Sequence, residues 1–570
     1  MRSILPTPLK KLFGNIPSFS KSGKHSLIYL NITQFLGVIN DNVFKFVMAF
    51  LLIDTLGHSE ASSILSATGA IYVIPFLLFS SSAGILADRF SKQKLLVIMK
   101  VAEIILMILA IFAFATKAVW ACYTLLFILS THSAIFGPSK YGIIPELVPA
   151  DKVSRANGLV TSFTYLAIII GTFLASFLTE ITNRHFVLIA IFCLFVATGG
   201  FFSALAIKPT TSQGSKKKIN LLFVREIYKT LRGARNVRHL LPAICGSSFF
   251  LLIGAFTQLN IIPFALQSLN LSEVAGGYLF LATALGIALG AFLAGKASRK
   301  RIELGLSCLA GFGIALFFIL IALFPNHLLN VVICLIAIGI LGGAFIVPFD
   351  TFIQLSSGDE KRGQTIGATN FLSFLGVLFA SLALYFFNQV IGLSSAHSFA
   401  VMGVVTLIAS IALTLNLSDM VLPFFSRKIL RYFLRFSPPK QDAVEKLPKK
   451  ILILESATWK NAILLAGTMP NIHFLIPSGS KMWHRLLRFV DSFHLIQNET
   501  EFDQMLQTAK IYADKDLVPC LLLERPLSQK VQSSTSSFLD FFKRTSTTVL
   551  CVKPIKDPST GKSSFVFEKG

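Results

Sequence analysis

Twelve long apolar segments govern what this chain can fold into. A helix needs about 20 mostly apolar residues to cross the hydrocarbon core of a bilayer, and each segment reaches that length. Hydrophobic residues make up 54% of the 570 residues and charged residues only 14%, which is typical of a polytopic membrane protein and not of a soluble enzyme. We expect twelve membrane-spanning α-helices, at residues 28–54, 63–87, 95–115, 119–138, 158–179, 186–207, 241–266, 274–296, 303–324, 329–350, 365–391 and 395–417.

Basic residues account for the net charge of +24 and predict the orientation of the spans. They gather in alternate gaps between the apolar segments, whereas the other gaps hold little besides Lys117 and Arg184. Because basic loops stay on the cytoplasmic side of a membrane, we expect the basic gaps to be cytoplasmic. An even number of spans then places both termini there. The lipid bilayer, and not a nucleic acid, is the partner that this charge pattern indicates.

The seven cysteines are scattered and form no Cys-x-x-Cys pair. Five of them lie inside apolar segments, where cysteine behaves as a small apolar residue. We therefore expect no disulfide framework and no metal site. The sequence also has no Gly-x4-Gly-Lys-Ser/Thr loop, so neither a nucleotide nor another cofactor is expected.

Two loops of similar sequence point to an internal duplication. Residues 84–94 read GILADRFSKQK, and residues 290–301, which begin 206 positions later, read GAFLAGKASRKR. A second pair, Pro138 to Gly158 and Pro348 to Asn370, is offset by 210 positions. Two features that repeat at nearly one spacing indicate two similar halves. In membrane proteins, duplicated bundles of this kind usually move a substrate by alternating access.

The first of these loops offers a means of holding one conformation closed. Gly84 permits close approach of neighbouring backbones, and Asp88 can accept hydrogen bonds at the start of the following helix. The order Gly-x-Leu-Ala-Asp-Arg resembles the loop between helices 2 and 3 of the major facilitator superfamily. Three basic residues of the loop can pair with cytoplasmic acids, namely Arg89, Lys92 and Lys94.

The first span carries the richest cluster of polar residues in any span, namely Gln34, Asn40, Asp41, Asn42 and Lys45. Charged residues within a membrane are costly and face a cavity or a partner. Asp41 and Lys45 lie four residues apart on one helix face, so they can pair. That face offers both a cation and an anion, as a zwitterionic head group requires. We expect these residues to bind the substrate; the alternative is a structural ion pair between helices.

Two further acids, Glu103 and Asp350, lie within or near the ends of spans. Either could couple transport to protons, and either could equally be an interfacial residue at a helix end. His132, which lies within the fourth span, is expected to make helix contacts and not to relay protons.

Several stretches together resemble a known family, namely residues 34–45, 84–94, 137–147, 155–158 and 301–305. They are similar to the bacterial lysophospholipid transporters of the major facilitator superfamily, especially those fused to an acyltransferase that re-acylates 2-acylglycerophosphoethanolamine. The resemblance implies flipping of lysophosphatidylethanolamine, and of other lysolipids, across the bacterial inner membrane. Together with the repeats, it marks seven residues as serving the conformational change, namely Pro138, Lys140, Glu146, Arg155, Asn157, Arg362 and Asn370.

The tail departs from that family. The acyltransferase carries an Asn-His-x4-Asp motif in which His is the general base, yet Ser456 stands at the His position and Asn461 at the Asp position. A later Pro-Glu-Gly motif keeps only Glu524. Ser cannot act as the base and Asn cannot supply the orienting charge, so we expect an acyltransferase-like domain without catalysis. A separate acyltransferase or acyl-carrier-protein synthetase would then be a partner.

The expected fold is an all-α polytopic bundle with a small C-terminal α/β domain. The expected parts are a cytoplasmic leader, an N-terminal six-helix half, a cytoplasmic linker, a C-terminal half, a basic juxtamembrane segment and the tail domain, at residues 1–27, 28–207, 208–240, 241–417, 418–448 and 449–570. The linker alternates apolar and basic residues at helical spacing. Both a helix on the anionic membrane surface and a solvated linker with a short helix fit this pattern.

The expected mechanism is rocking of the two halves about a central cavity, with the acyl chain in a Phe-rich cleft. A lipid gradient, trapping by acylation or an ion gradient could each supply the energy. Three alternatives have different functions: an exporter of drugs or metabolites, a membrane-anchored acyltransferase, and a lipid-binding scaffold that does not transport.

Overall fold

A computed structural model describes residues 25–215, 217, 223–298 and 302–425, together with residue 465 and six strands nearer the C-terminus. Most of the expected leader, most of the basic juxtamembrane segment, and Ser456, Asn461 and Glu524 lie outside the described residues.

The described residues contain twelve helices long and apolar enough to cross a membrane, as the sequence predicts. The first six are α2 (Ser26–Leu56), α3 (Ala61–Arg89), α4 (Lys92–Ala115), α5 (Val119–Gly142), α7 (Val153–Ile181) and α8 (Phe186–Leu205). The second six are α10 (Leu240–Ser268), α11 (Glu273–Ala297), α12 (Leu304–Leu323), α13 (Leu328–Ser356), α14 (Arg362–Tyr385) and α15 (Ser395–Asn416). Short elements join or follow them, namely η2 (His58–Glu60), α6 (Ile144–Leu147), η3 (Ala150–Lys152), the π-helical η4 (Phe386–Val390) and α16 (Ser418–Phe425).

Helix ends follow local capping chemistry. The side chain of Ser91 accepts a hydrogen bond from the Lys94 N–H at the start of α4, and Ser272 does the same for Ala275 at the start of α11. Each serine satisfies a backbone donor that the first turn of a helix leaves without a partner. Several spans contain an internal proline without ending there, as α5 does at Pro138, which neighbouring helices in a membrane bundle tolerate.

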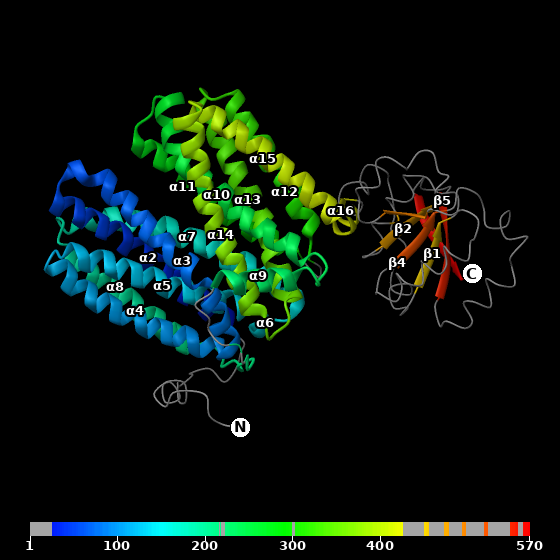
Figure 1. Ribbon diagram of the computed structural model, residues 1–570, viewed down its shortest axis with the longest axis horizontal. Coiled ribbons are helices and arrows are strands. Elements are labelled where there is room, and N and C mark those ends of the chain that lie inside the picture. Colours follow the sequence, from blue (N-terminus) through cyan, green and yellow to red (C-terminus); the bar gives the residue numbers. More distant parts are fainter. Residues whose placement is uncertain are drawn as a thin grey trace, which may run out of the picture. The chain divides into compact units, whose positions relative to one another are not determined.

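The first six helices pack together, and helices α10, α11, α13 and α14 pack in the second group (Figure 1). In the first group an apolar core runs between α2, α4, α5 and α8 and includes Phe44, Met107, Leu126 and Ile189. In the second group α11 and α13 come close because glycines face each other. A Cβ on Gly339 would overlap the Thr283 carbonyl oxygen and approach the Cα of Gly286. Small residues permit this approach in the membrane.

The linker contains a helix, α9 (Phe223–Ala234), as its amphipathic pattern predicts. Helix α9 packs against α3, α10 and α14. Its Glu226 is buried and lies 2.6 Å from Lys217 Nζ and 3.2 Å from Lys229 Nζ. The contact with Lys217, more than that with Lys229, holds the pKa of the Glu226 carboxyl below its usual range.

The C-terminal part contains a six-stranded sheet with the order β3-β2-β4-β1-β5-β6. The strands are β1 (Lys450–Leu454), β2 (Ile472–Pro477), β3 (Phe493–Ile496), β4 (Val518–Leu522), β5 (Thr548–Lys556) and β6 (Ser563–Lys569). All neighbours are parallel except β5 and β6. The sequence predicts β1, β2, β4 and β5; β3 and β6 are additional. The helices expected between the strands fall outside the described residues.

The Gly339 contact predicts a contrast between two glycine substitutions. Gly339→Ala should lower the melting temperature in detergent by several degrees, because overpacking costs roughly 1–3 kcal/mol. Gly254→Ala is the control: it also lies within a span, and its Cβ would meet nothing within 4 Å. Equal melting temperatures for the two variants would contradict the close α11–α13 packing.

Candidate functional site

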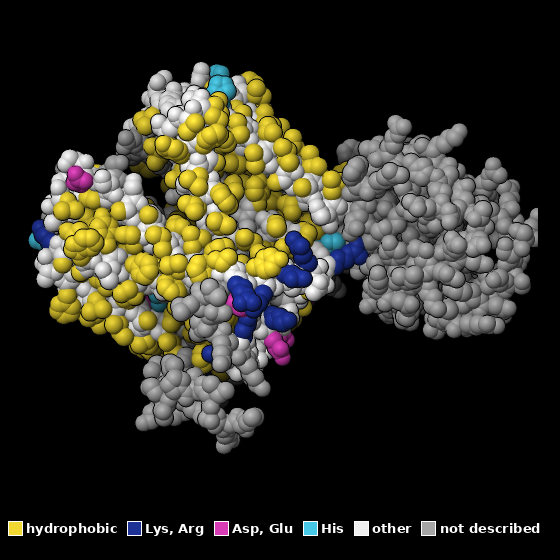
Figure 2. Space-filling model, in the orientation of Figure 1, with side chains coloured by type: hydrophobic (Ala, Val, Ile, Leu, Met, Phe, Trp, Pro, Cys, Tyr) yellow, Lys and Arg dark blue, Asp and Glu magenta, His cyan; other side chains and the backbone are white. Residues whose placement is uncertain are grey.

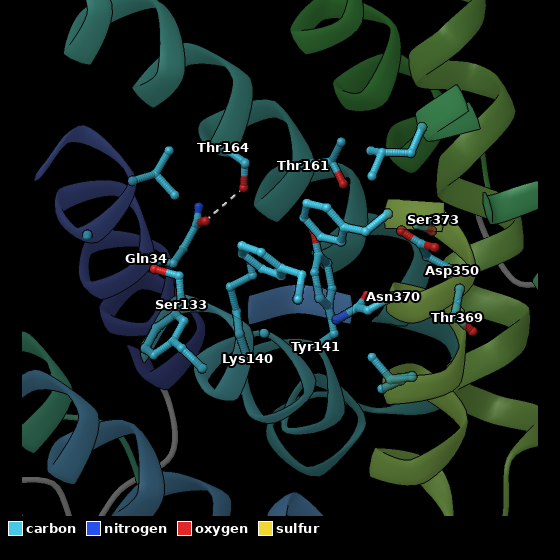
Figure 3. A pocket seen from close by; sticks show the side chains of 18 of the residues that line it. Gln34, Ser133, Lys140, Tyr141, Thr161, Thr164, Asp350, Thr369, Asn370 and Ser373 are labelled. Atoms are coloured by element: carbon cyan, nitrogen blue, oxygen red, sulfur yellow. Dashed lines mark hydrogen bonds between the residues drawn. The ribbon is translucent and has the colours of Figure 1, made fainter. Parts of the chain in front are cut away.

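A cavity of about 310 Å³ lies between the two groups of helices. Five helices of the first group (α2, α3, α4, α5 and α7) and three of the second (α10, α13 and α14) line it. Figure 3 shows Gln34, Ser133 and Lys140 facing the pocket from one side, and Asp350, Thr369, Asn370 and Ser373 facing it from the other. Much of the remaining wall is apolar, with Val38, Phe76, Phe136, Ile168, Phe250 and Phe374. The cavity therefore combines a charged interior with an apolar wall.

Asp41 brings a carboxylate to the cavity from α2. Its Oδ2 accepts a hydrogen bond of 2.7 Å from Ser133 Oγ on α5. Its Oδ1 is buried and has no hydrogen-bond partner among the described residues. Burying a charged oxygen without a partner is costly, so this atom is available for a cationic ligand.

Lys140 brings an ammonium group to the same cavity from α5. The residue is only 8% exposed, and within the part of the chain that the structure describes its Nζ makes no hydrogen bond or ion pair. Nζ lies 4.5 Å from the centre of the Tyr141 ring. The acids near enough to attract the Lys140 ammonium electrostatically are Asp41 and Asp350. A buried cation with no direct partner is the arrangement expected for a site that binds an anion.

Asp350 is the acid that the second group of helices contributes. Its Oδ1 accepts a hydrogen bond of 2.8 Å from Ser247 Oγ on α10. Asp350 thus lines the cavity from α13, six residues before that helix ends at Ser356.

A buried ion pair lies at the α4 side of the cavity. Lys100 Nζ is 2.6 Å from Glu103 Oε2, and both side chains are almost fully buried. Asn40 Nδ2 donates to Glu103 Oε1 at 2.9 Å, so each oxygen of Glu103 has a partner. Lys100 also passes between Gly37 and Gly200, where a Cβ would come close to its Nζ. This pair is structurally satisfied in a way that Asp41 and Lys140 are not.

Only two of the five residues predicted in the first span line the cavity, Gln34 and Asp41. Gln34 accepts from Thr164 Oγ1 at 2.8 Å (Figure 3) and links α2 to α7. Asn40 faces Glu103, as described above. Asn42 donates to the Val38 carbonyl at 2.8 Å, and Lys45 Nζ lies 3.4 Å from Asn42 Oδ1.

The pairing expected between Asp41 and Lys45 is not formed. Lys45 Nζ instead lies 4.6 Å and 5.1 Å from the ring centres of Phe46 and Tyr72. Ser133, which belongs to another helix, donates a hydrogen bond to the carboxylate of Asp41. Spacing along one helix cannot show which side chain a neighbouring helix will supply.

Asp88 links the two groups of helices. The sequence suggested a contact with the following helix, α4, but Asp88 contacts α14. It is fully buried at the end of α3 and accepts from the backbone N–H of Gly363 at 2.6 Å and of Gln364 at 2.9 Å. The Gln364 side chain adds a third donor at 3.1 Å. These are donors of the first turn of α14, which a carboxylate stabilises. The expectation of the following helix was wrong because Ser91 already caps α4.

The backbones of α3 and α14 are close enough that only glycine fits. A Cβ on Gly84 would lie 2.5 Å from the Gly363 carbonyl oxygen. Helices α7 and α11 make an equivalent close contact at Gly158 and Gly295. The position 206 residues after Asp88 is occupied by Ala294, so the repeat supplies no carboxylate at this contact. Asn157 instead exchanges hydrogen bonds of 3.0 and 2.9 Å with Gln354 on α13.

The remaining predicted residues lie around these contacts. Lys92 Nζ is 2.6 Å from Glu146, and Arg89 donates to the Lys217 carbonyl. Arg362 donates to the Gln354 carbonyl and pairs with Asp359. Pro138 is buried within α5 and Asn370 lines the cavity, whereas Arg155 is exposed and Lys94 is half-buried. These positions lie toward one end of the bundle, which we call the basic end, where α3 ends and α4, α7 and α14 begin.

Sequence reasoning missed Lys100, Ser133 and Ser247 and assigned Lys140 to the conformational change alone. Lys100 carried a signal, because a cation three residues before Glu103 inside an apolar run predicts a pair on one helix face. The two serines carried none, since their roles depend on which helices become neighbours.

Comparison with known proteins assigns the family. The Major Facilitator Superfamily model matches residues 30–381 and, in an overlapping second match, residues 248–476. The chain belongs to the Major Facilitator Superfamily. Its similarity extends to the "Lysophospholipid transporter LplT" of Enterobacter sp. (strain 638), 28% identical over 345 residues that cover 59% of this chain and 81% of that protein. The protein of the same name from Serratia proteamaculans (strain 568) is 25% identical over 367 residues, covering 62% and 85%.

Two solved structures of transporters share the fold. The human organic anion transporter MFSD10 (TETRAN) aligns with a TM-score of 0.59 at 12% identity, covering 69% of this chain and 100% of that chain. A bacterial homologue of the iron transporter ferroportin, solved in an outward-facing state, aligns with a TM-score of 0.54 at 14% identity, covering 69% and 98%.

The Asp88 contacts predict the effect of Asp88→Asn. An amide cannot offer two acceptor oxygens to the α14 donors, and a lost hydrogen bond to a charged group costs roughly 1.5–3 kcal/mol. Double electron–electron resonance between spin labels on α3 and α14 should show a larger population separated at the basic end. Asp151→Asn removes an exposed acid at that end and is the control. An unchanged distance distribution in Asp88→Asn would show that Asp88 does not hold the contact.

The buried Lys100–Glu103 pair predicts strong coupling between two substitutions. Lys100→Met leaves an uncompensated carboxylate and should destabilise the protein by about 3–5 kcal/mol. Lys100→Met combined with Glu103→Gln should melt at a higher temperature in detergent than Lys100→Met alone. Additive losses of stability would mean that the two residues are not paired in the folded protein.

Proposed function

We propose that this chain is a secondary transporter that moves lysophospholipids, lysophosphatidylethanolamine among them, across a bacterial inner membrane. The similarity to proteins named lysophospholipid transporters supports the substrate class. The observation that carries the proposal is the unpaired, buried Lys140 in a cavity that also holds the free oxygen of Asp41.

The charges of the cavity suit a zwitterionic head group. A phosphate diester is an anion and would bind the ammonium of Lys140, which has no partner of its own. An ethanolamine ammonium would bind Asp41 Oδ1, with Asp350 as the second acid of the site. The apolar wall with Phe76, Phe250 and Phe374 would accompany the single acyl chain. Gln34 would position α2 against α7. The other predicted residues of α2 would lie next to the site without lining the cavity, namely Asn40, Asn42 and Lys45.

Alternating access would require the contacts at the basic end to break. The positive-inside rule would place this end, and both termini, in the cytoplasm. The contacts of Asp88 and Asn157 would then close the bundle toward the cytoplasm. Figure 2 shows the surface hollowed between the two groups of helices at its upper left, away from the basic side chains of α9. Opening would separate Gly84 from Gly363 and Gly158 from Gly295.

Asp350 is the better candidate of the two proposed coupling acids. Glu103 has Lys100 and Asn40 as partners, whereas Asp350 has only the Ser247 hydroxyl among the described residues. A carboxylate without a fixed cation can bind a proton or a substrate ammonium in turn.

The C-terminal domain at residues 449–570 would be an acyltransferase-like domain without catalysis, so we propose no enzymatic activity for the chain. Re-acylation of the delivered lysolipid would fall to a separate acyltransferase, with or without an acyl-carrier-protein synthetase.

Transport in proteoliposomes tests the proposal. Wild-type protein should move head-group-labelled lysophosphatidylethanolamine, and Asp41→Asn or Lys140→Gln should slow its translocation roughly 10- to 100-fold, the effect of losing about 1.5–3 kcal/mol from a charged hydrogen bond. The matched controls are Asp54→Asn, on the same helix but at its exposed end, and the exposed Lys152→Gln. Both controls should transport at the wild-type rate.

Other outcomes would point elsewhere. Transport in Asp41→Asn and Lys140→Gln at the wild-type rate would keep the substrate and refute the site. If folded wild-type protein did not transport lysophosphatidylethanolamine, and hydrophobic cations competed with one another for transport, an exporter of drugs or metabolites would be favoured. Acyl transfer from acyl-carrier protein that is lost on truncation near residue 425 would show that the tail is an enzyme.

A further inference from the structure

The side chains of helix α9 form three stripes along its surface. One stripe faces the bundle and is buried at Glu226, Ile227 and Ala234. A second stripe is apolar and exposed: Val224 and Tyr228, one turn apart, are 60% and 63% exposed. The third is basic and exposed, at Arg225, Lys229 and Arg232. A helix that only filled a solvated linker would have no reason to keep two large apolar side chains in water.

Contacts with the bundle fix the direction of these stripes. The Phe223 ring lies 6.2 Å from the Phe371 ring of α14. Lys217, just before α9, donates to Gln364 at 2.8 Å and pairs with Glu226. These anchors hold the buried stripe against α14, so Val224 and Tyr228 are turned away from it.

Two of the basic side chains of α9, those of Arg225 and Arg232, are available for a ligand. Arg225 and Arg232 make no hydrogen bond or ion pair with any part of the chain that the structure describes. Arg235, beyond the end of α9, is exposed as well. In Figure 2, Lys and Arg side chains gather over α9 directly beside the apolar surface of the spans. Positive charge therefore lies where lipid-facing surface ends.

We propose that this face of α9, formed by Val224, Arg225, Tyr228, Lys229 and Arg232, binds the anionic head groups of the surrounding bilayer. Apolar side chains beside basic ones are what an interfacial helix needs, because the former enter the acyl region and the latter meet phosphates. Tyrosine is favoured at this depth for the same reason. The ligand is a structural lipid at the protein surface and is distinct from the substrate in the central cavity.

Titration of purified full-length protein in a zwitterionic detergent with fluorescent phosphatidylglycerol tests the proposal. Arg225→Gln/Arg232→Gln should weaken binding roughly fivefold for each charge removed. The matched control is Lys152→Gln/Lys296→Gln, which removes two exposed charges from the same end of the bundle and should bind like wild type. Neither α9 arginine makes a hydrogen bond or ion pair with the described residues, so the α9 variant, like the control, should melt at the wild-type temperature.

Salt and lipid type provide a second measurement. Raising sodium chloride from 50 to 500 mM should weaken wild-type binding more than that of Arg225→Gln/Arg232→Gln, and fluorescent phosphatidylcholine should bind more weakly than phosphatidylglycerol. Unchanged phosphatidylglycerol binding by the α9 variant would overturn the proposal. So would an equal loss in the control, which would indicate general charge attraction, or equal binding of the two lipids.

Discussion

A buried carboxylate at the end of α3 satisfies the first backbone N–H groups of α14. Asp88 can do this only because Gly84 and Gly363 let the two backbones come together. Asp88 is fully buried in the closed bundle, where the first donors of α14 cannot rely on water, so the contact supports the closed end of the bundle. It is also reversible, since water at the basic end can replace Asp88 once the helices separate. The second contact, between α7 and α11, lacks such an acid, and close packing with Asn157 takes its place.

Closure at one end gives the cavity its chemistry. Charged groups that water would otherwise solvate are held where few other groups can pair with them. Lys100 and Glu103 satisfy each other, whereas Lys140, Asp41 and Asp350 do not complete their pairing among the residues that the structure describes. The difference separates a structural ion pair from the proposed binding site. A zwitterionic lysolipid would supply both missing charges at once, and its chain would match the apolar wall. A ligand with one charge would leave either the ammonium or the carboxylates without a partner.

The sequence predicted the spans closely because their signal is local. Twenty apolar residues suffice to mark a helix, and the expected segment 119–138 lies within α5 (Val119–Gly142). The repeats at offsets of 206 and 210 positions likewise predicted two similar halves. The contacts between neighbouring helices could not be predicted. Ser133, and not Lys45, binds the carboxylate of Asp41, Asp88 binds donors of α14, and Asn42 faces away from the cavity. A helix pattern gives the face of each residue but not the neighbour that the face meets. Lys100 is the exception, since its spacing from Glu103 carried the signal.

Head-group selectivity of the wild-type protein tests the central claim most directly. Uptake of lysophosphatidylethanolamine into proteoliposomes would be compared with uptake of its N-acetylated analogue, which keeps the phosphate and the acyl chain but has no ammonium. The account predicts that the analogue is moved at least tenfold more slowly, and that Asp41→Asn/Asp350→Asn no longer distinguishes the two lipids. Equal uptake of both lipids by the wild-type protein would contradict recognition of a zwitterion by Lys140, Asp41 and Asp350.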